Sequence, residues 1–414
     1  MASKAEIKHI SGGITATPGF TASGVHCGIR RNKTKLDLAL IMADRDCVAA
    51  ATYTTNKVKA APIWLTMEHL KNSRARGIIA NSGVANACAP GDIDAARKTV
   101  SALAAETGFA PDDFIVNSTG VIGQVLPVDT ICTAIPALVE GLSRDGSNAA
   151  QAIMTTDTFP KEMAVQFTLG SKTVTIGGIA KGSGMIHPNM ATMFAFLTTD
   201  CDIDPSLLQA ALSSSVNSTY NRISVDGDTS TNDMVAILAS GGAGNPIISD
   251  IGEDYDAFLS ALNEVNLKLC KDIARDGEGA TKLITAKVSG AASQESAVTI
   301  ARSVISSSLV KAAMFGEDAN FGRVLCAMGY SGGLTNPVGG QSPRVDIAFS
   351  SVAGKIDMCR HGQGLSFDEI EAKKILSEKD VDIEITLYEG SQYAEAYGCD
   401  LTYDYVKING DYRS

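Results

Sequence analysis

A threonine stands at an abrupt change of character in the segment KGSGMIHPNMATMFAFLTTD, residues 181–200. Glycine and polar residues precede Thr192, whereas residues 193–197 carry no polar side-chain atom. The ordinary interpretation is a β-branched residue that begins a strand. The chemical alternative is self-cleavage, in which the Thr192 hydroxyl attacks the Ala191 carbonyl and hydrolysis of the ester frees the threonine α-amino group. That amine has a reference pKa of about 7.7–8.0, so it can serve as the base for the adjacent hydroxyl.

The residues before this threonine suit such a reaction. Gly182 and Gly184 allow unusual backbone angles, and Pro188 stiffens the approach to the cleavage point. Ala191 leaves the scissile carbonyl uncrowded, and the apolar strand that follows would anchor Thr192. Residue types alone leave both interpretations of Thr192 open.

Motifs for other chemistries are missing from the sequence. The segment 182–187 lacks the last glycine of G-x-G-x-x-G, and neither G-x-x-x-x-G-K-[ST] nor G-x-S-x-G occurs. The five histidines are far apart and the nine cysteines never form C-x-x-C, so we predict no metal site and no disulfide framework. The acidic segment 226–233 lacks the glutamate that closes a calcium loop, and its Asp-Gly pair favours a turn.

Composition restricts the class of protein. Of the 414 residues, 45% are hydrophobic and 20% are charged, with a formal net charge of −11. This length predicts one large or two ordinary domains, and the negative charge disfavours nucleic acid and anionic membranes as partners. No apolar run reaches the roughly 18 residues of a membrane span. The start MASKAEIKHISGG has no secretory pattern, so we expect a cytoplasmic location. The scattered, odd-numbered cysteines predict reduced thiols.

Short β-rich runs alternate with helical patterns, which predicts a layered α/β protein. Asp204 and Pro205 predict a helix start, as do Ser366 and Glu369 through a capping-box pattern. The predicted strands cover 36–42, 47–53, 77–81, 114–117, 163–169, 174–179, 193–198, 234–239, 283–288, 345–349 and 381–387. Further helices are predicted over 94–106, 130–142, 256–274 and 297–314. Pro136 should kink or break the second of these.

The segment around Thr192 resembles, almost word for word, the cleavage-site motif of the glutamate N-acetyltransferase (ornithine acetyltransferase) family of arginine biosynthesis. Other segments resemble the motifs of that family in the same order along the whole chain. They are GGITATPGFTASGVHCGI near the start, NSGVANAC at 81–88, NSTGVIG at 117–123, TTDTFPK at 155–161, ARDGEGATK at 274–282, GEDANFGR at 316–323 and the terminal INGDYRS. Small departures occur at Ala319, Phe321 and Gly410, where the family often has Pro, Trp and Ala.

The resemblance implies a fold, a processing event and an assembly. The expected fold is an α/β/β/α sandwich of stacked sheets, similar to N-terminal-nucleophile hydrolases, with a smaller C-terminal α/β domain. Cleavage between Ala191 and Thr192 would give an α chain of residues 1–191 and a β chain of residues 192–414. The two chains are expected to stay together as an α2β2 heterotetramer.

The resemblance also implies an activity and its residues. Thr192 would be the nucleophile that takes the acetyl group from N-acetylornithine and passes it to glutamate, giving ornithine and N-acetylglutamate. Thr119 and Gly120 would form the oxyanion hole, since a hydroxyl and a glycine N–H both donate to a developing alkoxide. The substrate contacts would be Thr158, Lys181, Thr192, Glu278, Asn409 and Ser414.

Residue types alone favour a structural role, rather than a functional one, for several of these positions. Residues 118–120 would form a turn after the strand 114–117. Lys181 and Glu278 would be solvated surface charges. In the role that the resemblance gives them, Lys181 pairs with a carboxylate and Glu278 with an ammonium group.

Two further functions remain open at the level of sequence. An N-terminal-nucleophile aminopeptidase or amidase would hydrolyse the same acyl-threonine, because water would replace the amine acceptor. A non-catalytic binding protein could keep the scaffold without being processed. We predict no cofactor, and acetyl-CoA remains open as a second acetyl donor.

Overall fold

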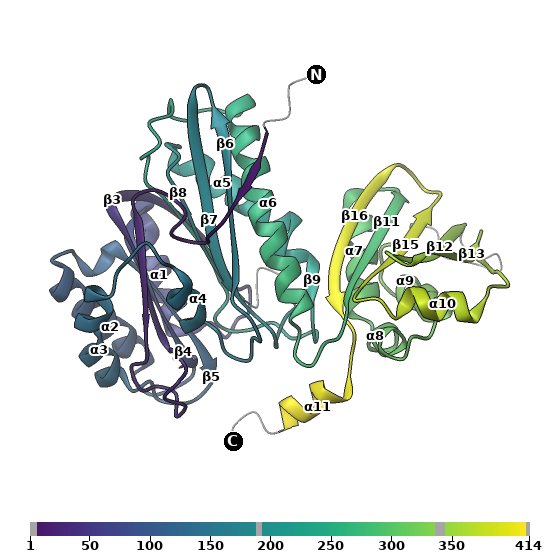
Figure 1. Ribbon diagram of the computed structural model, residues 1–414, viewed down its shortest axis with the longest axis horizontal. Helices are drawn as coiled ribbons and strands as arrows, with labels where there is room; N and C mark the ends of the chain where they lie inside the picture. The colour runs from purple at the N-terminus through teal and green to yellow at the C-terminus, as the bar shows by residue number, and fades with distance from the viewer. Residues whose placement is uncertain (1–5, 188–192, 336–343, 411–414) are drawn as a thin grey trace. The chain divides into compact units, whose positions relative to one another are not determined.

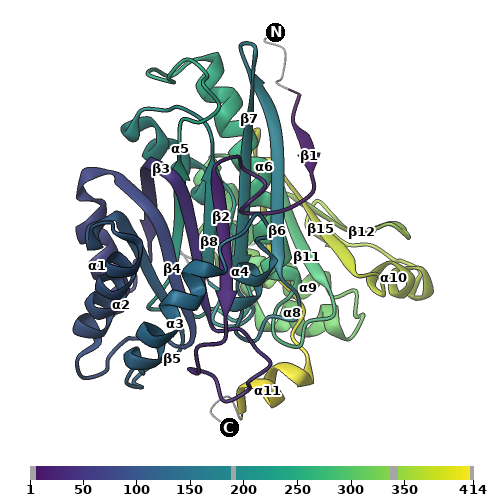
Figure 2. The same ribbon diagram turned by 60° about the vertical axis from the view of Figure 1, so that its left-hand side comes forward.

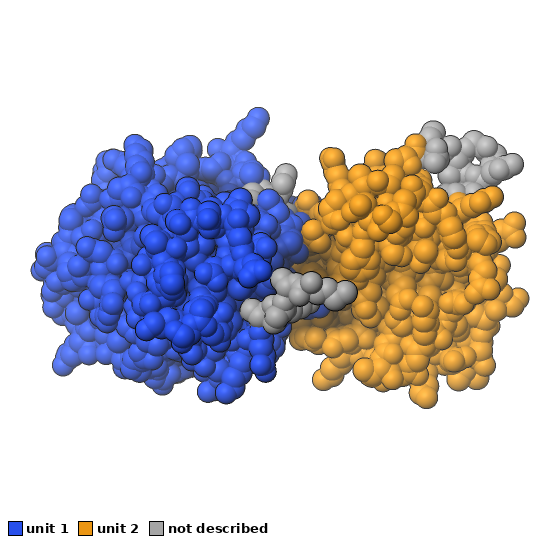
Figure 3. Space-filling view, turned by 90° about the horizontal axis from the view of Figure 1, so that it is seen from above, with its two compact units in different colours: residues 1–221, 228–273 blue, residues 222–227, 274–414 orange. Residues whose placement is uncertain are grey.

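The computed structural model describes residues 6–187, 193–335 and 344–410 of the chain. The chain divides into two compact units (Figure 3). Unit 1 comprises Met1–Asn221 and Asp228–Ile273, and unit 2 comprises Arg222–Gly227 and Ala274–Ser414. Each unit has its own sheet and its own helices, so each is described by itself.

Unit 1 is built on one mixed sheet (Figure 1). Its strands are β1 (Lys8–Ile10), β2 (Phe20–Val25), β3 (Leu38–Tyr53), β4 (Arg74–Val84), β5 (Phe114–Val121), β6 (Lys161–Leu169), β7 (Lys172–Lys181), β8 (Phe194–Thr199) and β10 (Met234–Ala239). They are hydrogen-bonded in the order β1-β6-β7-β8-β10-β3-β4-β5, and β2 pairs with β3. The α-helices of this unit are α1 (Ala61–His69), α2 (Asp92–Thr107), α3 (Val128–Glu140), α4 (Ser147–Ala152), α5 (Pro205–Ser218) and α6 (Glu253–Arg275).

The sheet of unit 1 curls into two layers. Strand β3 has 16 residues, and its pairing with β4 shifts register between Met42 and Cys47. One apolar cluster contains side chains from both halves of the sheet, such as Ile115 of β5 and Phe196 of β8. Helices α1, α2 and α3 cover the outer face of the β3–β5 half (Figure 1). On the other half, the rings of Phe258 in α6 and Phe167 in β6 lie 6.4 Å apart. This helix–sheet–sheet–helix arrangement confirms the predicted sandwich.

Strands β8 and β10 are adjacent, parallel and largely apolar, with Phe194 opposite Met234. All residues of both strands are buried. Strands buried on both faces read as continuous apolar runs, which is why the sequence predicted both correctly. The strand that follows Thr192 is therefore in the middle of the sheet. Figure 2 brings forward β2 and the short helix α4, which packs against it.

Unit 2 is a smaller α/β domain, as predicted. Its strands are β9 (Ile223–Ser224), β11 (Leu283–Ala291), β12 (Val345–Ser351), β13 (Gly354–Arg360), β14 (Gln363–Gly364), β15 (Asp380–Leu387) and β16 (Gln392–Cys399), in the sheet order β14-β13-β12-β15-β11-β16-β9. Its helices are α7 (Gln294–Ser306), α8 (Ser308–Phe315), α9 (Phe321–Gly329), α10 (Glu369–Leu376) and α11 (Tyr403–Gly410). Helices α7 to α10 share one apolar cluster with the sheet, which leaves the opposite sheet face polar.

Three helix predictions need correction. The helix predicted over 297–314 is two helices bent by 57°, because the Ser307 side chain accepts a hydrogen bond from the Val310 N–H and starts α8. Helix α10 begins two residues later than the capping-box pattern indicated, since its N-cap is Asp368 rather than Ser366. Helix α3 continues through Pro136, which is exposed, while Ile135 and other residues of the opposite face are buried.

Within the described part of the chain, no helix by itself combines the length and the apolar composition that a membrane span needs. Helices α7 and α8 reach that length and composition only when they are taken together across their 57° bend.

Candidate active site

Thr119 and Gly120 lie inside strand β5, so the turn that residue types favoured is wrong. Strand β5 continues to Val121 because it pairs in parallel with the equally long end of β4, with Gly83 opposite Gly120. Gly120 has a φ of +133°, and a Cβ atom there would lie 2.2 Å from the Gly83 carbonyl carbon. Only glycine fits this position. Both residues are half-buried, which leaves them accessible to a small ligand.

Buried polar side chains lock the ends of β4 and β5 just before these two residues. The Ser118 hydroxyl donates to Asn81 Oδ1 at 2.6 Å, and Asn81 Nδ2 donates to the Val84 carbonyl at 2.9 Å. Both side chains are buried. Because their hydrogen bonds are made to each other and to the backbone, the oxyanion candidates rest on a rigid support.

Lys181 is buried at the end of β7, where its strand partner is Phe194 of β8. It is therefore not the solvated surface charge that residue type favoured. Burial lowers the pKa of Lys181, and the charge of the nearby Asp157 opposes that shift. Burial alone would raise the pKa of Asp157, but Lys181 and Lys161 hold it well below its usual range.

Asp157 makes hydrogen bonds beside both predicted substrate contacts of unit 1, Thr158 and Lys181. Its Oδ1 atom accepts from Lys161 Nζ at 2.7 Å and from the Gly182 N–H, which follows Lys181, also at 2.7 Å. Its Oδ2 atom accepts from the Thr155 N–H at 2.9 Å. The next residue in the chain is Thr158, which is exposed. The carboxylate thus fixes the backbone beside both Thr158 and Lys181.

The predicted substrate contacts of unit 2 also meet. Glu278 is buried in the turn after α6, and Asn409 of α11 donates to its Oε2 atom at 2.7 Å across 131 residues of sequence. Gly279 has a φ of +70°, and a Cβ atom there would lie 2.8 Å from the Tyr405 amide nitrogen. The Thr402 hydroxyl donates to the Gly279 carbonyl at 2.7 Å. The turn at Gly279 is therefore packed directly against the start of α11.

The structure leaves part of the predicted site undescribed. Ala191, Thr192 and Ser414 lie outside the described residues. Thr119, Gly120, Thr158 and Lys181 belong to unit 1, whereas Glu278 and Asn409 belong to unit 2. Their meeting around one substrate stays a prediction from the resemblance, as does the cleavage at residues 191–192.

Two residues with a structural link to this site were missed by sequence reasoning. Asp157 and Lys161 are in the segment TTDTFPK, of which only Thr158 had been singled out. The available signal was the spacing: an acidic and a basic residue lie four positions apart, beside the predicted contact Thr158. Nothing in the sequence indicated that both side chains would be fully buried.

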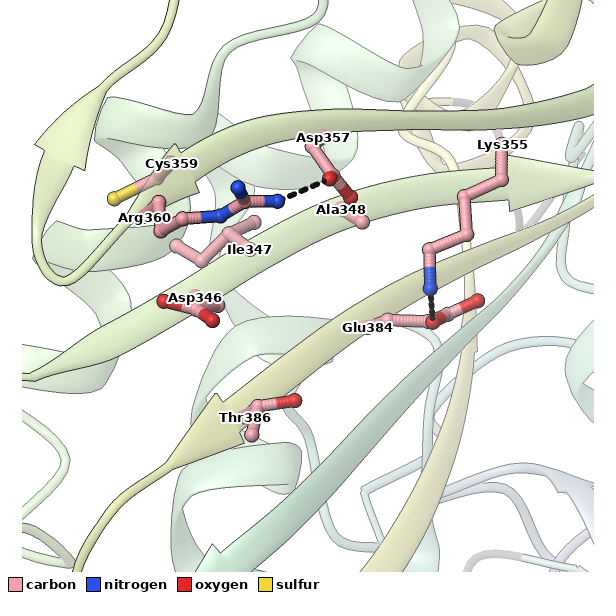
Figure 4. Close-up of a pocket in the computed structure, with 9 residues that line it drawn as sticks. All are labelled: Asp346, Ile347, Ala348, Lys355, Asp357, Cys359, Arg360, Glu384 and Thr386. Carbon is pink, nitrogen blue, oxygen red and sulfur yellow. Dashed lines mark hydrogen bonds and ion pairs between the residues drawn. The ribbon is translucent and has the colours of Figure 1, made fainter.

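The open sheet face of unit 2 carries a shallow pocket of about 130 Å³ (Figure 4). Its charged side chains pair with one another: Lys355 Nζ lies 2.5 Å from Glu384 Oε2, and an Arg360 nitrogen lies 2.9 Å from Asp357 Oδ2. Paired, exposed charges of this kind are typical of a solvated surface. Across residues 6–187, 193–335 and 344–410, no group of three or more His, Cys, Asp or Glu residues could hold a metal ion.

The family model described as the ArgJ family matches residues 21–414. The chain belongs to the ArgJ family. Among ArgJ relatives, the arginine biosynthesis bifunctional protein ArgJ 1 of Clostridium acetobutylicum is 51% identical over 97% of both chains. The arginine biosynthesis bifunctional protein ArgJ of Thermotoga neapolitana is 49% identical over 96% of this chain and 99% of its own.

Solved structures of ArgJ relatives were also found. The ArgJ protein of Bacillus halodurans is 46% identical, with a TM-score of 0.49 over 53% of this chain and 99% of its own. The ornithine acetyltransferase of Mycobacterium tuberculosis, solved in complex with ornithine, is 36% identical, with a TM-score of 0.42 over 45% of this chain and all of its own.

Proposed function

We propose that this ArgJ-family chain is a self-processing acetyltransferase that moves the acetyl group from N-acetylornithine to glutamate. The observation that carries the proposal is the similarity to relatives named as bifunctional proteins of arginine biosynthesis. About half of the residues are identical, and the similarity extends over nearly the whole chain. The position of Thr119 and Gly120 at the half-buried end of β5 supports it. So does the buried Lys181, since a desolvated lysine binds a carboxylate more strongly than an exposed one.

The proposed reaction has two acyl-transfer steps. The Thr192 hydroxyl, deprotonated by its own α-amino group, attacks the acetyl carbonyl of N-acetylornithine. The Thr119 hydroxyl and the Gly120 N–H donate to the oxyanion that forms. Ornithine leaves with the transferred proton, and acetyl-threonine remains. The amino group of glutamate then attacks this ester, which releases N-acetylglutamate and restores the free threonine.

Three further features belong to this proposal. Acetyl-CoA would be a second acetyl donor, in keeping with the word bifunctional in the names of the relatives. The cleaved chains would assemble as an α2β2 heterotetramer without a cofactor. We place the reaction in the cytoplasm, because all nine cysteines are free thiols, as expected in a reducing compartment.

The test of this function is a kinetic and mass-spectrometric study of the purified protein. Initial rates at varied N-acetylornithine and several fixed glutamate concentrations should give parallel double-reciprocal lines, the form expected of a covalent acyl-enzyme. After N-acetylornithine alone, one acetyl group should appear on the fragment that begins at Thr192. Intersecting lines without an acetylated fragment under rapid quench would exclude the acetyl-threonine. Acetate formed faster than N-acetylglutamate in the presence of glutamate would favour the amidase instead.

Replacing Asp157 by asparagine should change the pH dependence of transfer. Lys181 must be protonated to pair with a substrate carboxylate, and it is surrounded by Asp157, Lys161, Asp233 and Arg30. Loss of the Asp157 charge lowers the pKa of Lys181 further. The alkaline limb of the profile of kcat/KM for glutamate should therefore move to lower pH, as measured by initial rates across the pH range.

The matched control is Asp204→Asn. The Asp204 side chain caps helix α5 by accepting from the Ser206 N–H at 2.8 Å, and asparagine is an equally good cap. Its profile should match that of the wild type. An Asp157→Asn enzyme with an unshifted alkaline limb would contradict the role given to Asp157.

A further inference from the structure

Asn232 is a buried side chain that connects the central strand β10 to β5, at the end of the sheet order. It lies in the segment before β10, is 3% exposed, and its Nδ2 atom donates to the Ser118 carbonyl at 2.7 Å and to the Ala85 carbonyl at 2.6 Å. In return, Asn117 Nδ2 donates to the Asn232 carbonyl at 3.1 Å. In the sheet order β3 and β4 separate β10 from β5, so these bonds link strands that are not neighbours.

The same segment also holds the chain that carries the cleavage point. The Met234 N–H donates to the Met193 carbonyl at 3.1 Å. On the other side of residues 188–192, the Thr229 hydroxyl donates to the His187 carbonyl at 2.8 Å, and Thr229 forms a β-bridge with Ile186. Residues 229–234 thus contact the chain both before and after the predicted cleavage site.

We propose that Asn232 is a positioning residue that holds the oxyanion donors of β5 at a fixed place relative to the strand that follows the nucleophile. The proposal rests on the proposed function. Because the peptide group is planar, fixing the Ser118 carbonyl also fixes the direction of the Thr119 N–H and the start of the next peptide unit. Thr119 and Gly120 follow directly along the strand, so a displaced Ser118 carbonyl would also displace the Thr119 side chain and the Gly120 N–H. Asn232 acts through these residues and takes no part in the bond changes.

The choice of Asn232 agrees with the chemistry of its partners. Its amide offers two donors and one acceptor, and all three are used: the donors by two backbone carbonyls and Oδ1 by the Thr231 hydroxyl. Leucine has a similar volume and would fill the space, but it would leave both carbonyls without their donor. Loss of orientation at a reacting centre lowers turnover more than it lowers ground-state binding.

The experiment is a double-mutant cycle between Asn232→Leu and Thr119→Ala, with kcat expressed per cleaved chain. Asn232→Leu alone should lower kcat by about 10- to 100-fold while KM changes by less than about threefold. In the Thr119→Ala background the same substitution should cost much less, because a misplaced donor no longer matters. A merely structural role would give the same loss in both backgrounds, and that result would overturn the proposal.

The matched control is Asn245→Leu, in the same unit. Asn245 is 5% exposed and, like Asn232, bonds to the backbone: its Oδ1 accepts from the Asp202 N–H at 2.9 Å and its Nδ2 donates to the Pro246 carbonyl at 2.8 Å. It should lower the melting temperature to a similar extent and leave kcat unchanged. An equal loss of kcat in Asn245→Leu would also overturn the proposal.

Two additional measurements test the proposal if Asn232→Leu does not fold or if the wild type is inactive. If Asn232→Leu does not fold, Asn117→Ala replaces it. That change removes the donor to the Asn232 carbonyl and the acceptor of the Ser118 N–H, and it should lower kcat in the same direction by a smaller factor. If the wild type forms no N-acetylglutamate, the proposed function fails by itself, and the cycle is then measured on the rate of self-cleavage. Additive effects on that rate would overturn the positioning role independently.

Discussion

Replacing Thr192 by alanine should leave the purified chain in one piece and abolish acetyl transfer. The hydroxyl that attacks the Ala191 carbonyl would be gone, and so would the nucleophile that carries the acetyl group. Denaturing electrophoresis should show one band for the variant and two fragments of similar size for the wild type. Sequencing of the C-terminal wild-type fragment from its N-terminus should begin Thr-Met-Phe-Ala-Phe.

Thr192→Ser is the control for this experiment. It keeps a hydroxyl at the same place, so it should retain part of the cleavage and part of the transfer. A Thr192→Ala chain that still splits between residues 191 and 192 would refute self-cleavage by this residue. The uncleaved Thr192→Ala chain should still melt in a cooperative transition, because the following strand β8 is buried independently of the hydroxyl.

Replacing Thr119 by alanine should lower kcat by about 10²- to 10³-fold, the usual loss for one oxyanion donor. The KM values should change little, because the donor acts on charge that develops only in the transition state. Thr119 is half-buried at the end of β5, so the change removes one methyl and one hydroxyl without opening a core cavity. Initial rates must be measured on fully processed protein, since the same donors could assist self-cleavage.

Thr119→Ser retains the hydroxyl and should recover most of the activity, which separates the hydrogen bond from packing. Gly120 does not allow a comparable test. Any Cβ atom there would collide with Gly83, so loss of activity in Gly120→Ala would report a distorted strand. An unchanged kcat in processed Thr119→Ala would reject the oxyanion role.

Helices and strands that are determined by residues close together in the sequence were predictable from the sequence. Strand β10 begins and ends at the predicted residues, because an apolar run buried on both faces has the same appearance in any fold. Asp204 and Pro205 start α5 as expected, since an N-cap and a first-turn proline act within a few residues. The resemblance of eight segments to one family likewise needed no coordinates.

Segments whose secondary structure depends on pairing with residues far away in the sequence were not predictable from the sequence. Residues 118–120 form strand rather than a turn because β4 extends alongside them, and their sequence contains no record of that pairing. The helix break at Ser307 has a local cause, the N-cap bond from the Val310 N–H, but the apolar pattern over 297–314 is that of a single helix and concealed it. Segment 226–233 was predicted to form a turn at its Asp-Gly pair; it lies between β9 and β10 outside any helix or strand, and its role as a link between strands was not foreseen.

The sequence by itself determined the family, the apolar strands β8 and β10, and the candidate nucleophile, because these depend on residue order. Only the tertiary structure decided that Lys181 is buried beside Asp157 and that Asn232 reaches the Ser118 carbonyl, 114 residues away. The physical reason is that a buried polar group must find its partner wherever the fold provides one. Hydrogen bonds of this kind carry no fixed spacing, so no local pattern records them.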